Sequence, residues 1–132
     1  MVQNTTEDPV FGPIISTYSR AEAIEDSVLV DVSNTGRQLG VVLPVALTSA
    51  AYELVNRTYT SQDPVGRLMD VVLLAAMSLD GNEGELPFTR PFYTYIQNGR
   101  KKIAYFKAVL SVEDVGGGEP AVCITIMLPN ED

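Results

Sequence analysis

A chain of 132 residues is long enough for one domain with its own hydrophobic core. An apolar share of 45% is typical of globular proteins and excludes an intrinsically disordered chain. The 17 acidic residues outnumber the 9 basic ones and give a formal net charge of -8, which argues against nonspecific binding to nucleic acid or to an anionic membrane.

The first elements predicted along the chain are short. Residues 1–9 are polar and end in proline, so we expect a flexible arm in front of the folded part of a single domain that spans 1–132. Ser19 and Glu22 match a capping box, in which the serine side chain accepts a backbone hydrogen bond and the glutamate reaches back. This pair predicts a short helix over residues 20–26.

The middle of the chain predicts extended segments followed by two helices. Apolar residues run through 28–32 and 41–45, with turn residues between them. Thr48 is placed to cap a helix over 49–56. The segment 64–79 begins with proline and is apolar around most of its circumference, which predicts one buried central helix.

The last third changes to the alternating period of strands. Apolar and aromatic runs at 92–97, 101–112 and 121–128 predict a three-stranded antiparallel meander. In the second run the even-numbered residues from Ala104 to Val112 share one face, which we expect to pack on the helices. These patterns predict an α+β fold with short amino-terminal helices and extended segments, one buried central helix, and this meander packed on the helices.

The residues that most often carry enzyme chemistry are scarce. Histidine is absent and there is one cysteine, Cys123. This composition excludes Ser–His and Cys–His nucleophilic pairs, and a structural zinc site with the usual sulfur and nitrogen ligands. Cys123 lies in an apolar run and is expected to be a buried, unreactive thiol. We therefore expect no catalytic residues, no metal and no cofactor.

Four carboxylates gather around the first predicted helix, namely Glu22, Glu25, Asp26 and Asp31. A buried pair of carboxylates can act as acid and base, but ordinary burial preferences favour a solvated face here. Such a face is suited to bind a basic partner protein. We take these four residues as the candidate partner-binding site.

A basic and aromatic stretch lies between residues 86 and 112, where five basic side chains occur without an acidic one. Aromatic rings interleave with them, which is typical of surfaces that stack single-stranded nucleic acid, with Arg100, Lys101 and Lys102 as the contacts. In the alternative interpretation, which we favour, the lysines protect the edge of a hairpin from pairing with other chains.

Another interpretation is a nucleotide-using transferase that works without histidine. Tyr18, Ser19 and Arg20 would then shape a ligand pocket in which Arg20 holds a phosphate. The alternative is an exposed Arg20 in the first turn of a helix, and the position of this residue beside the predicted cap favours it.

Five segments of the chain carry a resemblance to a known protein family: 14–26 (IISTYSRAEAIED), 28–33 (VLVDVS), 44–48 (PVALT), 66–70 (GRLMD) and 124–129 (ITIMLP). In these segments the chain resembles an uncharacterised family of small acidic proteins from phages, plasmids and prophages. It departs from the family pattern at Ser27, where glycine is usual, and near Met69, where tryptophan is frequent. The resemblance provides no catalytic residues.

The resemblance implies an accessory protein of a mobile element, a class that often counters host defences by binding a defence protein. Together with the acidic balance, it leads us to expect a non-enzymatic protein-binding module in the host bacterial cytoplasm, an inhibitor of a CRISPR, restriction or similar nuclease complex. Its partner would be a basic host protein that binds nucleic acid, and the four carboxylates around the first helix would contact it. No membrane partner is expected.

Overall fold

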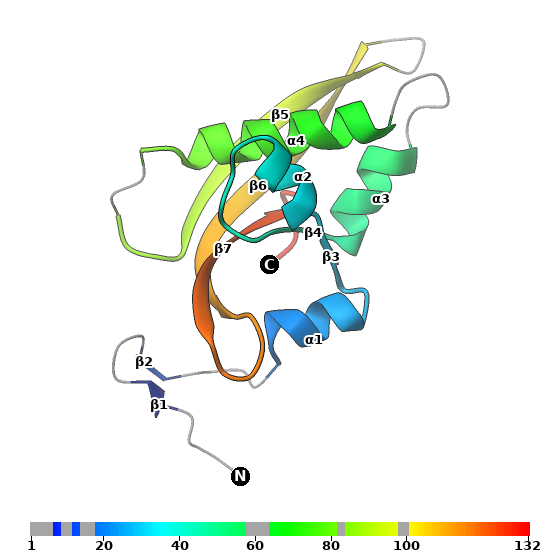
Figure 1. Ribbon diagram of the computed structural model, residues 1–132. Coiled ribbons are helices and arrows are strands. Elements are labelled where there is room, and N and C mark those ends of the chain that lie inside the picture. Colours follow the sequence, from blue (N-terminus) through cyan, green and yellow to red (C-terminus); the bar gives the residue numbers. More distant parts are fainter. Residues whose placement is uncertain (1–6, 9–11, 14–17, 58–63, 82–83, 98–100) are drawn as a thin grey trace.

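A five-stranded sheet with helices on both faces organises the chain in the computed structural model (Figure 1). The structure describes residues 7–8, 12–13, 18–57, 64–81, 84–97 and 101–132. Its helices are α1 (Arg20–Glu25), α2 (Ser33–Gln38), α3 (Ser49–Arg57) and α4 (Pro64–Leu79). Its strands are β1 (Glu7–Asp8), β2 (Gly12–Pro13), β3 (Leu29–Asp31), β4 (Val45–Thr48), β5 (Phe88–Gln97), β6 (Lys101–Asp114) and β7 (Pro120–Met127). Strands β1 and β2 pair only with each other, and most of the predicted amino-terminal arm lies outside the described residues.

The main sheet is mixed and has the strand order β3-β4-β7-β6-β5. Neighbours β5, β6 and β7 are antiparallel, and β7 then pairs in parallel with β4, which pairs with β3 at the edge. The three predicted carboxy-terminal strands are therefore part of a wider sheet in an α+β fold. Strand β4 lies inside it because Val45, Ala46 and Leu47 are all apolar and buried on both faces, at 1% exposure or less.

The helix starts show how local sequence sets the amino-terminal elements. Ser19 and Glu22 form the predicted capping box in front of α1, and the Thr48 hydroxyl accepts a hydrogen bond from the Ala51 backbone at 3.2 Å at the start of α3. Helix α2 stands where the sequence predicts a turn. Just before it, the Asp31 carboxylate accepts hydrogen bonds from the backbone and hydroxyl of Ser33, the first residue of α2, at 3.2 and 2.6 Å.

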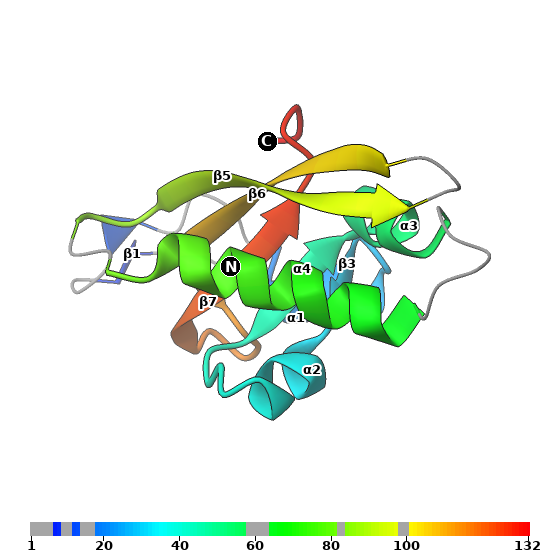
Figure 2. The ribbon, with the colours of Figure 1, turned by 90° about the horizontal axis from the view of Figure 1, so that it is seen from above.

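The longest helix, α4, has the predicted bounds but only one buried side. It lies against β5, β6 and β7, with α2 and α3 beside it (Figure 2). Val71, Val72 and Ala75 are at most 2% exposed, whereas Leu73 and Met77 are 40% and 62% exposed. The helix thus covers the sheet as an outer layer instead of being enclosed as the sequence predicts. No helix in the described part of the chain is long and apolar enough to cross a membrane.

Strands β6 and β7 present alternate residues to the two faces of the sheet, as the sequence predicts, except that Val112, which the sequence places on the core face, lies outside the core. Phe106 and Ala108 point into the core, where Phe106 stacks on Phe92 with ring centroids 5.4 Å apart. Ile124 and Ile126 of β7 belong to the same core. The odd-numbered residues of both strands therefore face the other side, the side on which α1 lies (Figure 1).

Candidate functional site

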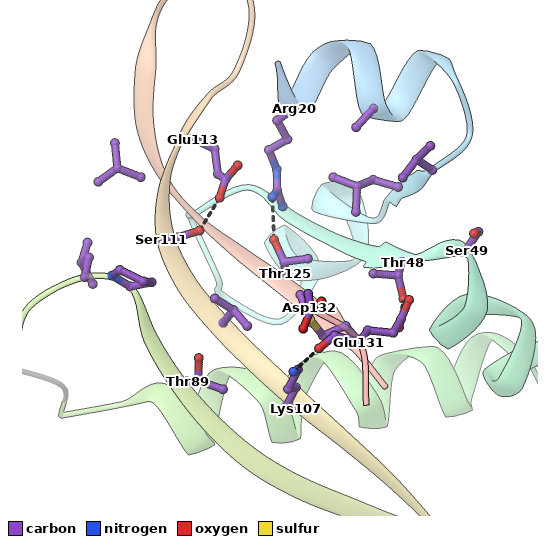
Figure 3. Close-up of a pocket in the computed structure, with 18 of the residues that line it drawn as sticks. Arg20, Thr48, Ser49, Thr89, Lys107, Ser111, Glu113, Thr125, Glu131 and Asp132 are labelled. Atoms are coloured by element: carbon purple, nitrogen blue, oxygen red, sulfur yellow. Dashed lines mark hydrogen bonds between the residues drawn. The ribbon is translucent and has the colours of Figure 1, made fainter. Parts of the chain in front are cut away.

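The face of the sheet opposite α4 carries a hollow of about 1400 Å³ (Figure 3). The odd-numbered residues of β6 and β7 form its floor, α1 and β3 border one end, and the segments before β5 and after β7 border the rest. Much of the lining is apolar and comes from Ala23, Val28, Leu29, Leu86, Pro87, Val109, Val112 and Met127. The hollow thus combines apolar lining with charged groups at defined points.

Arg20 reaches into this hollow from the first position of α1. One terminal nitrogen of its guanidinium donates to the Thr125 hydroxyl at 2.7 Å, and the other donates to the Ile124 carbonyl at 2.6 Å. The side chain is only 4% exposed, which corrects the expectation of a solvent-exposed arginine. The capping box fixes where α1 begins, and a small threonine on β7 leaves room for the long side chain to cross to the sheet.

The other hydrogen-bonded charges of the hollow are also held by neutral groups. Lys107 donates to the backbone carbonyl of Glu131. The Ser111 hydroxyl donates to the Glu113 carboxylate at 2.5 Å, and the Thr48 hydroxyl donates to the Glu131 carboxylate at 2.7 Å. Within the described part of the hollow, these hydrogen bonds join no two side chains of opposite charge.

Negative charge prevails around the hollow. Its described lining has four carboxylates, Glu85, Glu113, Glu131 and Asp132, against the cations Arg20 and Lys107. The carboxylates are spread over the loop before β5, β6 and the segment after β7. Within the described ranges, no three side chains of the metal-binding types gather closely enough to hold an ion. The carboxylates therefore form an extended, mainly negative surface and not a compact ion-binding site.

The single cysteine lies beside the hollow, on the same face of β7. Cys123 is fully buried, and its thiol faces the Ala121 carbonyl at 3.5 Å. Burial raises the pKa of the Cys123 thiol; the Arg20 charge lowers it, and the Glu113 charge raises it. The buried position confirms the sequence prediction. Because the raised pKa keeps the thiol protonated at neutral pH, Cys123 lacks the thiolate character of a nucleophile.

The carboxylates predicted as a partner-binding site lie outside the lining of the hollow. Glu22 accepts a hydrogen bond from the Ser19 backbone in the capping box, and Asp31 accepts one from the Ser33 backbone at the start of α2. Glu25 is exposed at the end of α1, and exposed Asp26 accepts a hydrogen bond from the Tyr18 hydroxyl at 2.7 Å. Glu22 and Asp31 thus stabilise the starts of helices, whereas Glu25 and Asp26 face solvent.

The contact between Tyr18 and Asp26 makes a pH-dependent prediction. The hydrogen bond to Asp26, with smaller contributions from desolvation and from the Asp26 and Glu22 charges, raises the pKa of Tyr18 above its ordinary value of 10.0. A raised pKa means that the bond stabilises the fold below about pH 10 and that this contribution is lost as the pH rises through the folded-state pKa. We expect Asp26→Asn to lower the pKa of Tyr18, as followed by the pH dependence of its ring NMR signals. Glu25→Gln is the matched control, and an unchanged pKa in Asp26→Asn would contradict the contact.

The basic aromatic hairpin is described only in part. Side chains are not described for the three predicted nucleic-acid contacts, since Arg100 lies outside the described residues and Lys101 and Lys102 are described only as part of the β6 backbone. The rings divide between the two faces of the sheet. Phe92 and Phe106 are in the core, whereas Tyr93 and Tyr105 are 52% and 58% exposed, with centroids 6.2 Å apart. Two of the rings expected to form the stacking platform, Phe92 and Phe106, are thus part of the hydrophobic core.

Comparison of the chain with protein-family models, with curated proteins and with solved structures finds no match. The resemblance to a family of mobile-element proteins therefore stays a prediction, and the function has to be argued from the hollow. Of the charged residues that line the hollow, only Arg20 was among the candidate site residues predicted from the sequence. The available signal was the β6 alternation, which places Lys107, Ser111 and Glu113 together on the face away from the core.

Proposed function

We propose that the chain is a non-enzymatic binding module that receives a basic segment of another protein in the hollow on the open face of the sheet. One observation carries the proposal: carboxylates outnumber cations two to one in a hollow with much apolar lining, and those with described hydrogen bonds are held by neutral donors. An apolar base with a charged border is the usual composition of a surface that recognises protein. The excess of negative charge selects lysine-rich or arginine-rich partners.

The size of the hollow supports a peptide segment as its occupant. Pockets for small ligands usually measure about 300–1,000 Å³, and this hollow measures about 1400 Å³. Its charges lie on several elements, from α1 across the sheet to the segment after β7 (Figure 3). A ligand that meets several of them has to extend across the sheet, as a length of polypeptide does.

The hydroxyl groups of the hollow favour recognition over covalent chemistry. The hydroxyls of Ser111, Thr48 and Thr125 hold Glu113, Glu131 and Arg20 in place. The sequence contains no histidine to activate any of them as a nucleophile. These hydroxyls thus set the orientation of charges that a partner would meet.

For the class of partner, we retain the proposal drawn from the family resemblance. A protein that binds nucleic acid exposes clustered lysine and arginine side chains, which an acidic surface can occupy in competition with phosphate. The nucleic-acid groove of a bacterial defence nuclease is such a surface. In this proposal the module is an inhibitor that acts in the bacterial cytoplasm.

The test is calorimetric titration of the purified chain with an amidated peptide of alternating lysine and leucine. We expect binding that weakens at least tenfold between about 0.1 M and about 1 M salt, since the screening length falls from about 10 Å to about 3 Å. The control peptide has glutamate in place of lysine and should not bind. Equal binding of both peptides, or binding that is indifferent to salt, would contradict the proposed electrostatic recognition.

A further inference from the structure

We infer that Arg20 is a carboxylate-binding site in the hollow, and that the basic segment bound there carries one carboxylate that Arg20 receives. This inference rests on the proposed function and specifies the ligand further. A purely basic segment would match Glu85, Glu113, Glu131 and Asp132 but would place positive charge against Arg20. A segment that also contains an acidic group matches both signs.

The hydrogen bonds of Arg20 support this assignment. A guanidinium has five N–H donors in a planar fork, and Arg20 uses two of them on the neutral acceptors Thr125 and Ile124. The side chain is more than nine-tenths buried yet lines the hollow. Within the described chain its hydrogen bonds go to no carboxylate. A buried positive charge without a hydrogen-bonded counter-charge is costly, and an anion from a ligand reduces that cost.

The surroundings of Arg20 select a carboxylate over a phosphate. Both anions match the fork of a guanidinium. A phosphate monoester, however, carries close to two negative charges at neutral pH, and it would meet the repulsion of Glu113 and the other carboxylates of the hollow. A carboxylate carries one charge, and cationic neighbours on the same segment satisfy the surrounding acids.

The distribution of the charges sets the arrangement of the ligand. Figure 3 shows Arg20 extending from α1 toward Thr125, with the Ser111 and Glu113 pair to one side and Glu131 to the other. The positive charge of Arg20 therefore has a negatively charged side chain on each side. The matching segment has an acidic residue in the middle and basic residues on both sides.

The experiment compares two amidated peptides of lysine and leucine that differ in one central residue, glutamate or glutamine, by calorimetric titration. Charge-assisted hydrogen bonds to Arg20 should make the glutamate peptide bind about tenfold more tightly. Arg20→Met should abolish this preference and leave the affinity for the glutamine peptide unchanged or higher. Lys107→Met, which removes the other cation of the hollow, should keep the preference.

Several outcomes would overturn the inference. Equal binding of the two peptides would refute the carboxylate site while leaving the proposed function standing. If the preference for the glutamate peptide survives in Arg20→Met and vanishes in Lys107→Met, the carboxylate site would belong to Lys107 instead of Arg20. If Arg20→Met does not fold, Thr125→Val, which removes one acceptor that orients Arg20, should reduce the preference, and an unchanged preference would count against Arg20.

A failure of the proposed function would be recognised separately. If neither peptide binds, the probe is sodium benzoate, measured by thermal shift against sodium chloride at equal ionic strength. Stabilisation of the wild-type chain that is absent in Thr125→Val and in Arg20→Met would support the carboxylate site by itself. Absence of stabilisation in the wild type would overturn it.

Discussion

Replacing Phe106 by alanine should lower the free energy of unfolding by about 3–5 kcal/mol, the usual cost of removing a buried aromatic ring. Phe106 is 1% exposed and stacks on Phe92 between the sheet and α4. Its loss removes both the apolar contact and the ring stacking, and it leaves a cavity that the strand and the helix cannot close without moving. Chemical denaturation followed by circular dichroism measures the change.

Tyr105 provides the matched control for this prediction. It is the neighbouring aromatic residue of β6, but it is 58% exposed and lies beside the exposed Tyr93. Tyr105→Ala should cost no more than about 1 kcal/mol, the range for one cross-strand pair. If Tyr105→Ala proved the more damaging change, the register of β6 would be shifted by one residue and its faces exchanged.

Reversing two charges of the hollow, Glu85→Lys with Asp132→Lys, should weaken binding of the basic peptide by about hundredfold. Each substitution removes an attraction and adds a repulsion at the same place. Both residues are exposed and line the hollow, so the fold should tolerate the changes. Calorimetric titration gives the affinity, and thermal unfolding verifies that the variant is folded.

The control for that prediction changes the net charge equally at another place. Glu25→Lys with Asp26→Lys makes the same substitution pattern on exposed residues of α1 and its end, which do not line the hollow. We expect a loss of affinity below about threefold, from the weakened long-range attraction alone. The opposite ranking of the two variants would assign partner binding to the carboxylates around α1, as the sequence alone predicts, and would refute the hollow as the binding site.

The elements that the sequence predicts well are those with a local cause. Ser19 and Glu22 are three residues apart and form the capping box of α1, and the helix over 64–79 has the bounds expected from its proline start and apolar pattern. The alternation in β6 correctly places Phe106 in the core. Each signal needs only neighbours in sequence, and each confirmed prediction is of that kind.

The features that the sequence does not predict depend on distant partners. Strand β4 has four residues, and its parallel pairing with β7 has no local signal. Helix α4 has apolar residues on its outer side as well, so composition cannot tell that Met77 is exposed. For the hollow, Arg20 and Thr125 are separated by most of the chain. Only the three-dimensional arrangement distinguishes this buried arginine from an exposed first-turn residue.

The parallel pairing of β4 with β7 has a consequence for how the chain is made in the cell. β7 lies between β4 and β6, so residues 120–127 have to leave the ribosome before the amino-terminal strands can join the rest of the sheet. Until then the apolar β4 has an unpaired edge, which is prone to aggregation. A nascent chain interrupted after α4 should therefore require chaperones or be degraded, whereas synthesis through β7 supplies the strand that joins β4 to β6.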